Sequence, residues 1–534
     1  MISTRRSFTR LILFAAVLLS AQTGRAVSIP AFHDHDIWCG LEREPDSLQD
    51  RPARPILSGP VLTRTRIHFK VHYTTQGRDS TTLAYAESTI VHAETSWVRL
   101  GRLGWYRPPS DQTAGGDSLY DIYIWDSISG SGVCQTDSAY TTPFPDGAST
   151  WIEILPNRDY DRLRTLVAHE FHHGCQKRYT RYDRPPKWFN ENSSVYMEDI
   201  VYPGLGNLYD YTRTYATSPV TNTWRPLVDT VDRYEYAAGL WPKFLVEYYG
   251  PTIVREIWEL NGMHAGNHTL SDMDSLLQRD YFSSLPDACG HYAIWRYFTG
   301  SRDDEMHFLE AESIGTANLL AVHTTYPVSG NSGVNGIYGP GGTHFIRFQS
   351  LGNRRLTVTF NGQDLYSWRV YVLMRYDGIT YEQRMLLDWS GDGSIDVAPG
   401  YADSVVLIPV EVGWMGDTAA TVQVSFTYSA DVVVDNAVVE AGGSVKPFLS
   451  AAGPNPAIEA AYLRWMLPTG TLGTLNIFDL TGRLIRSRQF AGTGDMQVWR
   501  WDLTDEYGRR IPSGVYYYSS SGFAPGNSGK IVVP

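Results

Sequence analysis

The hydrophobic period of this chain changes near residue 325, and this change constrains the fold more than any other feature of the sequence. Before it, short alternating runs predict strands and longer stretches with helical spacing predict helices. The strands are expected at 66–73, 119–125 and 149–155, and the helices at 82–103, 161–178 and across 232–300. We therefore expect an α+β domain over residues 66–325.

The sequence after residue 325 has a different pattern. Alternating apolar runs separated by Gly, Asn and Asp turns fill residues 330–440 and again 445–534, and this pattern is typical of β-sandwiches. At roughly 100–200 residues per domain, 534 residues are enough for about three or four domains. The fold class expected is therefore multidomain, with the α+β domain followed by a β-sandwich at 326–440 and an Ig-like β-sandwich at 445–534.

The N-terminus has the composition of an export signal. Arg5 and Arg6 precede a short apolar run at 11–19, and small residues end in Ala26. We predict a signal peptide over 1–26, exported by either the general secretory or the twin-arginine route. The next segment, 27–65, is rich in Pro and Arg and is expected to be an extended arm or a pro-segment. The protein is thus expected to be secreted or at the cell surface of a bacterium, with no transmembrane span in the mature chain.

Charge and cysteine content narrow the partners and the chemistry. The formal net charge of −12 disfavours nucleic acid as a partner, because phosphates attract basic surfaces. In an exported protein, four cysteines permit two disulfides, with three possible pairings. These residues are Cys39, Cys134, Cys175 and Cys289.

The motif that carries the chemistry is His169-Glu170-Phe171-His172-His173. Residues four apart share one face of a helix, so His169 and His173 can bind one metal ion. Glu170 is then placed to act as a general base toward metal-bound water. Zinc suits such ligands and keeps a position open when it is catalytic. The alternative is a His-rich helix face with ordinary surface histidines.

Two neighbours of this motif have less direct interpretations. His172 is interpreted as a residue that packs or supports the ligands rather than binding metal. Cys175 follows His173 by two residues, and it is expected to pack or to form a disulfide, with metal ligation as the alternative.

A third ligand is expected from Trp188-Phe189-Asn190-Glu191-Asn192. Here the chain resembles the gluzincin metallopeptidases, whose second helix carries a similar run with its Glu on the metal. The resemblance implies Glu191 as the ligand, with Glu198 and Asp199 as alternatives, although Asn192 stands where the family usually has Gly.

The same resemblance implies a donor for the oxyanion that develops during peptide hydrolysis. Gluzincins supply a Tyr or His from the following helical half. The first candidate in this sequence is Tyr236 and the second is Tyr234. The alternative is that these aromatic residues only pack against the helix.

The last domain resembles a different module. The segments 475–487 and 499–522 are similar to the type IX secretion C-terminal sorting domain and to the related FlgD-like Ig fold. This resemblance implies a partner in the export machinery and no role in catalysis. A plain Ig-like spacer is the alternative.

One loop has some features of a calcium site. Asp388, Ser390, Asp392 and Asp396 place oxygens at alternating positions, with a Gly at the sixth. The alternative is an ordinary Asp-Gly turn between strands.

Together these features predict a secreted zinc metallopeptidase, a hydrolase that cleaves peptide bonds of a protein or peptide substrate. The residues are His169, His173 and Glu191 on Zn²⁺, with Glu170 as base and Tyr236 as donor. Ca²⁺ is a secondary expectation. Two alternatives stay open: a surface binding or structural protein with a degenerate zincin domain, and a zinc hydrolase that acts on something other than peptides.

Overall fold

The computed structural model describes residues 53–533, with gaps at 129, 182–185, 206, 215, 265, 267, 353, 377–378, 398–401, 415–421, 434–447, 450–456, 458–459, 468–469, 494–495 and 522–527. The predicted signal peptide, most of the predicted arm and Cys39 lie outside the described residues. Within them, no helix combines the length and the apolar character needed to cross a bilayer.

The described part of the chain begins with a five-stranded sheet in the order β1-β2-β3-β5-β4. The three central strands run parallel, while β1 and β4 pair antiparallel at the two edges. The strands are β1 (Leu62–Thr65), β2 (Phe69–Tyr73), β3 (Tyr120–Ile124), β4 (Gly132–Ala139) and β5 (Ala148–Ile154). Side chains alternate between the two faces of such a sheet. Val71, Ile122 and Ile152 are fully buried on the face that joins the main core.

Two long helices contribute to this core. In α1 (Leu83–Arg102), the side chain of Thr82 caps the first turn by accepting from the Tyr85 backbone N–H. In α2 (Tyr160–Lys177), the side chain of Asp159 accepts from the N–H groups of Asp161 and Arg162. Such caps satisfy donors that have no partner within the helix. The second half of α2 is buried throughout, from Val167 to Lys177, and this half carries the histidine motif.

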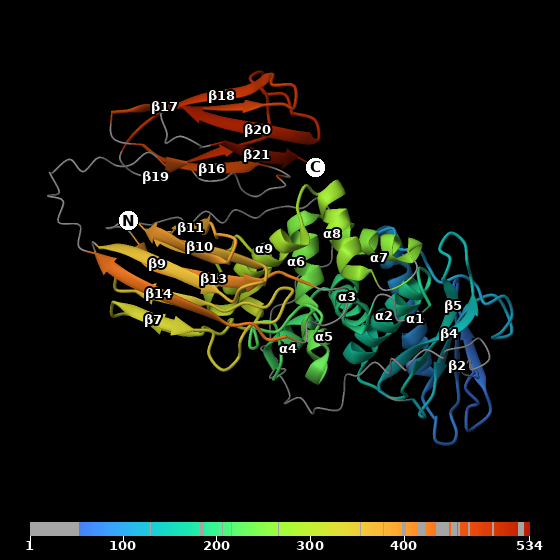
Figure 1. Ribbon diagram of the computed structural model, residues 1–534. Coiled ribbons are helices and arrows are strands. Elements are labelled where there is room, and N and C mark those ends of the chain that lie inside the picture. The colour runs from blue at the N-terminus through green and yellow to red at the C-terminus, as the bar shows by residue number, and fades with distance from the viewer. Residues whose placement is uncertain are drawn as a thin grey trace, which may run out of the picture.

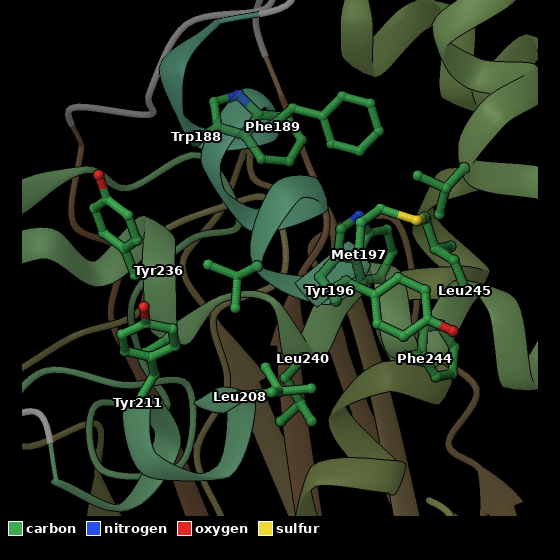
Figure 2. Close-up of a cluster of buried hydrophobic side chains, with 14 of the residues drawn as sticks. Trp188, Phe189, Tyr196, Met197, Leu208, Tyr211, Tyr236, Leu240, Phe244 and Leu245 are labelled. Atoms are coloured by element: carbon green, nitrogen blue, oxygen red, sulfur yellow. The ribbon is translucent and has the colours of Figure 1, made fainter. Parts of the chain in front are cut away.

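A group of helices follows, beginning with α3 (Lys187–Val201), which packs beside α2. The others are α4 (Asn207–Thr214), α5 (Tyr234–Ala237), α6 (Leu240–Tyr249), α7 (Ile253–Met263), α8 (Thr269–Asp280) and α9 (Leu285–Tyr297), with 3₁₀ turns η1 (Val231–Arg233), η2 (Gly300–Arg302) and η3 (Ala311–Ser313). Figure 2 shows the apolar cluster where α3 meets α5 and α6, with Trp188, Tyr196 and Met197 on α3. This packing holds α3 in place next to α2.

The middle of the chain forms a β-sandwich (Figure 1). One sheet has the order β11-β10-β13-β8-β6 and the other β12-β9-β14-β7. The strands are β6 (Ala321–His323), β7 (Val328–Asn331), β8 (Ile346–Gln349), β9 (Arg355–Gly362), β10 (Trp368–Tyr376), β11 (Ile379–Arg384), β12 (Asp392–Val397), β13 (Ala402–Glu411) and β14 (Phe426–Val433). Between the sheets lies a separate core that includes Val358, Val372 and Leu407. The opposite side of β10 and β13 contributes Tyr371 and Ile408 to the main core, so the sandwich packs directly onto the helices.

A second pair of sheets ends the chain, in the orders β15-β16-β19 and β18-β17-β20-β21. The strands are β15 (Phe448–Leu449), β16 (Ala461–Met466), β17 (Leu472–Phe478), β18 (Leu484–Ala491), β19 (Met496–Trp501), β20 (Gly514–Ser521) and β21 (Ser528–Val533). These sheets enclose their own core, which includes Trp465, Leu475 and Ile531. The prediction of a multidomain chain with an α+β part followed by β-sandwich parts is therefore confirmed at this level.

Two predictions require correction. The three described cysteines, Cys134, Cys175 and Cys289, are buried free thiols, so no disulfide joins any two of them. Cys175 and Cys289 lie in the main apolar core, where a free thiol packs like a small hydrophobic residue.

The predicted helical stretch at 232–300 is also broken several times. Near its start, Asp232 and Arg233 adopt left-handed backbone angles (φ 57° and 62°), and α5 ends after four residues.

Candidate metal centre

The structure brings the two motif histidines and the predicted third ligand together. His169 and His173 lie one turn apart on α2, and Glu191 reaches them from α3. His169 Nε2 is 3.0 Å from His173 Nε2 and 3.1 Å from Glu191 Oε2, while His173 Nε2 is 3.7 Å from Glu191 Oε2. Among the described residues, this is the set of His, Cys, Asp and Glu side chains whose ligand atoms converge closely enough to hold a metal ion.

These separations fit a tetrahedral zinc site. Zn–N and Zn–O bonds of roughly 2.0–2.1 Å at tetrahedral angles place neighbouring ligand atoms about 3.3 Å apart. The three observed separations of 3.0, 3.1 and 3.7 Å bracket that value. Glu191 supports the same conclusion, because its second oxygen, Oε1, is buried without a hydrogen-bond partner. The residues present thus fit a metal ion with two imidazole ligands and one carboxylate ligand.

The far side of each imidazole is held by a hydrogen bond. His169 Nδ1–H donates to Glu198 Oε1 at 2.7 Å, and His173 Nδ1–H donates to Gln176 Oε1 at 2.6 Å. When Nδ1 carries the only ring proton, the lone pair of each Nε2 is free to bind a metal ion. Partners of this kind fix the tautomer and the ring orientation of metal-binding histidines.

Gln176 also ties the two helices together. Its Nε2 donates to the Asn190 carbonyl at 2.9 Å and to Ser193 Oγ at 3.0 Å, both on α3. The side chain that orients His173 on α2 is therefore anchored to the helix that carries Glu191. The sequence prediction did not include Gln176. Its spacing of three residues after His173 was the only available signal, since it places the amide on the same helix face.

The alternative ligands have other roles in the structure. Glu198 is the hydrogen-bond partner of His169, and its second oxygen accepts from Asn207 Nδ2 at 2.8 Å. Asp199 faces Lys243 and Glu310, and burial raises the pKa of its carboxyl group. Neither residue joins the converging set.

His172 and Cys175 do not join it either. The Nδ1 of His172 lies 2.8 Å from Ser194 Oγ, and its ring packs edge-on against Trp105. His172 thus packs beside the two motif histidines, and whether it also supports them as ligands stays a prediction. Cys175 is fully buried in the main core, where burial raises the pKa of its thiol.

Glu170 is fully buried between α2 and the edge strand β4. A Cβ added at Gly132, the first residue of β4, would lie 2.8 Å from both Cγ and Oε1 of Glu170. Glycine at this position therefore leaves the space that the Glu170 side chain fills. The sequence prediction missed β4, and with it the strand that adjoins the candidate base.

The two tyrosine candidates differ in position. The Tyr236 ring stacks beside His169, with centroids 6.1 Å apart and planes 17° apart, and Figure 2 shows it next to Tyr211. Tyr234 faces Arg225, whose guanidinium lies 5.7 Å from the ring centroid. The structure thus places Tyr236, and not Tyr234, at the side of the metal-binding group.

The charges in the centre are strongly coupled. Burial opposes a charge on His169, but hydrogen bonds to Glu191 and Glu198 outweigh it and raise the pKa of His169 well above its usual value. Burial favours the neutral form of Glu191, yet hydrogen bonds from His169 and His173 lower its pKa to about 2. Burial lowers the pKa of His172 well below its usual value. These hydrogen bonds favour an ionised Glu191 carboxylate and a protonated His169, so a bound cation would replace the proton on His169 Nε2.

The loop considered for calcium is a turn. Asp388 Oδ1 accepts from the backbone N–H groups of Ser390 and Asp392 at 2.9 and 3.0 Å, as in an Asx-turn. Asp396 lies farther along, on β12, and its Oδ1 accepts from Thr357 Oγ1 at 2.6 Å. Among the described residues, the carboxylates of this loop do not form a converging set, so the calcium interpretation is not supported.

No protein-family model matches this sequence, and no functionally curated protein does. Among solved structures, the chain is 18% identical to dimeric latent PorU from Porphyromonas gingivalis, with a TM-score of 0.16. The match covers 34% of this chain and 18% of that one. PorZ, a surface component of the type IX secretion system of Porphyromonas gingivalis, is 20% identical with a TM-score of 0.13, and 20% of this chain and 14% of that one are covered. A β-glucuronidase from Ruminococcus gnavus is 10% identical with a TM-score of 0.13, over 36% of this chain and 35% of that one. TM-scores this low do not indicate a shared fold, so we draw no functional inference from these proteins.

Proposed function

We propose that this protein is a secreted, zinc-dependent peptidase. The observation that carries the proposal is the convergence of His169 Nε2, His173 Nε2 and Glu191 Oε2, with the opposite side of each imidazole already hydrogen-bonded. Glu170, the neighbour of His169 on α2, supplies a carboxylate beside the same centre. This is the arrangement that metal-assisted hydrolysis requires of a protein.

The edge strand β4 supports a peptide as the substrate. It is the last strand in the sheet order, so one side of its backbone has no partner within that sheet. An extended peptide can pair with such an edge through main-chain hydrogen bonds. Gly132 at the start of β4 contacts Glu170, so a peptide on this edge would approach the candidate base.

The roles of the protein groups follow from their positions. When bound, zinc would polarise the substrate carbonyl and make water more acidic. His169, His173 and Glu191 would hold the ion, while Glu198 and Gln176 keep the imidazoles oriented. Glu170 accepts a proton from the attacking water as its oxygen bonds to the carbonyl carbon. The hydroxyl of Tyr236 donates to the oxygen on which negative charge develops. Glu170 then gives its proton to the amine as the C–N bond breaks.

The test compares metal content and peptidase activity in the wild type and in Glu170→Gln, both purified as the chain that follows the predicted signal peptide. We expect near-stoichiometric zinc in both proteins and chelator-sensitive cleavage of unfolded casein only in the wild type. Cys175→Ser is the matched control, because this buried residue of α2 lies outside the metal-binding group, and it should keep both zinc and activity. Cleavage by Glu170→Gln at the wild-type rate would overturn the mechanism.

A second candidate function is that of a surface binding or structural protein whose metal centre only stabilises the fold. The burial of the site favours it, since His169, Glu170, Glu191 and Tyr236 are each less than 5% exposed. The same experiment separates the two functions. Zinc in the wild type without cleavage of any peptide substrate would favour the structural role, and absence of zinc would exclude the zinc centre in both.

For the C-terminal domain we propose a role in export or surface attachment. Support comes from the sequence resemblance to type IX sorting domains and from its core, which is separate from the other two. Removing residues 445–534 should abolish delivery to the surface of a host with type IX secretion. If the truncated chain reached the surface as efficiently as the whole chain, the domain would be a spacer.

A further inference from the structure

The face of the first sheet that points away from α1 and α2 is polar and yet buried. His72, Asp121, Tyr123 and Trp151 alternate with the core residues of β2, β3 and β5, and each is less than 8% exposed. Burial of carboxylates is costly unless each is paired. The side chain over this face is Arg54, which belongs to the segment before β1.

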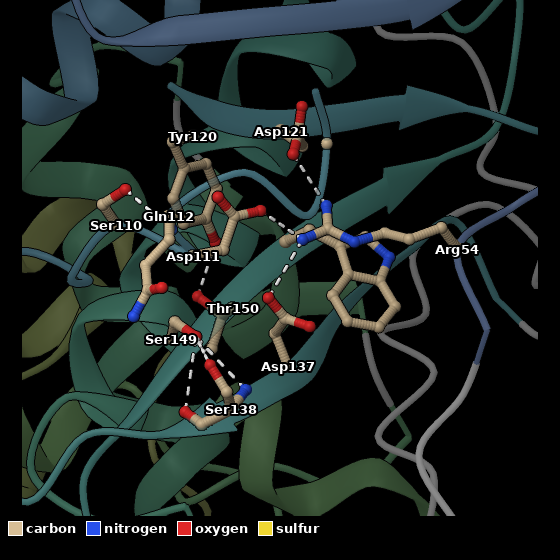
Figure 3. Close-up of polar contacts among 12 residues, drawn as sticks. Arg54, Ser110, Asp111, Gln112, Tyr120, Asp121, Asp137, Ser138, Ser149 and Thr150 are labelled. Atoms are coloured by element: carbon tan, nitrogen blue, oxygen red, sulfur yellow. Dashed lines mark hydrogen bonds and ion pairs between the residues drawn. The ribbon is translucent and has the colours of Figure 1, made fainter. Parts of the chain in front are cut away.

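Arg54 contacts three carboxylates from three different parts of the sheet region (Figure 3). Its guanidinium donates to Asp121 Oδ2 on β3 at 2.8 Å, to Asp137 Oδ2 on β4 at 3.1 Å and to Asp111 in the loop before β3. The same group lies over the Trp151 ring of β5, 4.5 Å from the centroid. Arg54 therefore connects a loop and three strands with one side chain. A planar guanidinium with several donors suits this role, and an ammonium does not.

The pocket that Asp111, Asp121 and Asp137 form around Arg54 holds more negative charge than this one guanidinium can neutralise. Burial and the neighbouring Asp121 raise the pKa of Asp111 to about 6, even though Arg54 acts in the opposite direction. His72 also contacts this group, since its Nε2 lies 2.7 Å from Asp121 Oδ1 and its ring stacks on Tyr123. Without Arg54, three carboxylates would face one another in a buried space. The pocket thus depends on this arginine.

Asp137 links the pocket to the candidate metal centre. It lies on β4, in the half where the pairing with β5 loses its regular register between Thr136 and Ala139. The other end of β4 is Gly132, which packs against Glu170. Between them, Thr136 Oγ1 accepts from Lys177 Nζ of α2 at 3.1 Å. Arg54 therefore holds the irregular half of the strand whose regular half adjoins Glu170.

We propose that Arg54 is a positioning residue that holds β4 in place next to Glu170. The segment from residue 53 onward therefore stays bound to the folded protein. The segment is then part of the working structure, and any pro-segment would have to end before Arg54. Its effect on catalysis rests on the proposed peptidase function, whereas its effect on β4 does not.

The test compares the wild type with Arg54→Ala, Arg54→Lys and the control Arg64→Ala. Arg64 lies ten residues further on and forms a solvent-exposed ion pair with Glu87, which contributes little to stability. Hydrogen exchange of residues 132–139 reports on β4 directly, and zinc content and the kinetics of peptide cleavage report on the site. Ethylguanidinium is added to Arg54→Ala, because it can occupy the space that the side chain leaves.

Arg54→Ala should show faster exchange in β4 than in β2 or β3, retained zinc and a fall in kcat of about tenfold or more, as expected when a catalytic group is displaced by up to an ångström. Ethylguanidinium should reverse both changes. Arg54→Lys should give values of β4 exchange and kcat between those of the wild type and Arg54→Ala, and Arg64→Ala should match the wild type in both. If Arg54→Ala does not fold, Arg54→Lys carries the same comparison.

The proposal would be overturned if hydrogen exchange of β4 in Arg54→Ala or Arg54→Lys were as slow as in the wild type. It would also be overturned if exchange became faster by the same factor across the whole domain and ethylguanidinium did not reverse the change. If the wild type proves to lack peptidase activity, the proposed function fails, but the exchange measurement still decides whether Arg54 fixes β4.

Discussion

Glu198 offers the sharpest test of how the metal centre is built. It accepts from His169 Nδ1 at 2.7 Å and is only 3% exposed. Glu198→Gln keeps an acceptor for the imidazole but removes the charge. Glu198→Ala removes both and leaves the buried Nδ1–H without a partner. Loss of such an outer partner typically weakens metal binding by roughly 10–100-fold. We expect about tenfold weaker zinc binding for Glu198→Gln and about 100-fold for Glu198→Ala, or ~1.4 and ~2.7 kcal/mol.

The assay is competition for zinc against a fluorescent chelator, in the chain that follows the predicted signal peptide. Because the same carboxylate contributes to the raised pKa of His169, a proton competes with the metal for this imidazole, so the affinities of all variants are compared over the same series of pH values. Two controls separate the hydrogen bond to His169 from other effects. Asn207→Ala removes the other contact of Glu198, and Asp199→Asn changes a neighbouring carboxyl that faces Lys243 and Glu310. Wild-type affinity in Glu198→Ala, or an equal loss in Asp199→Asn, would refute the reasoning.

Three further predictions concern other parts of the fold. Burial raises the pKa of Glu411 to about 7 from a usual value of 4.5, so the folded state binds the proton more tightly, and stability falls as pH rises from 4.5 to 7. The free energy of unfolding in urea should therefore be higher for Glu411→Gln than for the wild type, by up to ~3 kcal/mol at pH 8 and by much less at pH 5. An equal difference at the two pH values would contradict this. Gly132→Ala should displace Glu170 and lower kcat about tenfold while zinc is retained. Gly315→Ala is the control, since a Cβ there meets nothing closer than 3.4 Å, and it should leave kcat unchanged. Peptide-cleavage kinetics and metal content test both variants. Asp159→Ala should lower the unfolding free energy by ~1 kcal/mol through loss of the α2 cap, and an unchanged denaturant midpoint would count against that role.

Local sequence patterns predicted the elements that carry the ligands. Predicting that His169 and His173 share one face required only the 3.6-residue period of a helix. The structure contains this helix as α2 (Tyr160–Lys177). The alternating runs after residue 325 likewise predicted strands that the structure contains. Glu191 needed more than periodicity, since its assignment came from the similarity of its run to a known family, and the structure brings it to the two histidines.

Other features were decided only when distant segments packed together. β4 reads GVCQTDSA, which has no clear alternation, and it forms a strand because it pairs with β5 and packs against α2. The expected helix around Tyr236 breaks after Ala237, and the short helix α5 that remains packs against α3. Arg54 and Asp137 are 83 positions apart, and their pairing depends on how the sheet is assembled.

The same division holds within the metal centre. The sequence by itself determined that His169 and His173 could bind one metal ion, because periodicity sets which residues share one helix face. The tertiary structure decided what each carboxylate does. Glu191 and Glu198 lie on the same helix and could each have been the ligand, but the packing of α3 on α2 directs Glu191 to the Nε2 side of His169 and Glu198 to the Nδ1 side. That choice depends on contacts between residues far apart in the chain, which no local pattern encodes.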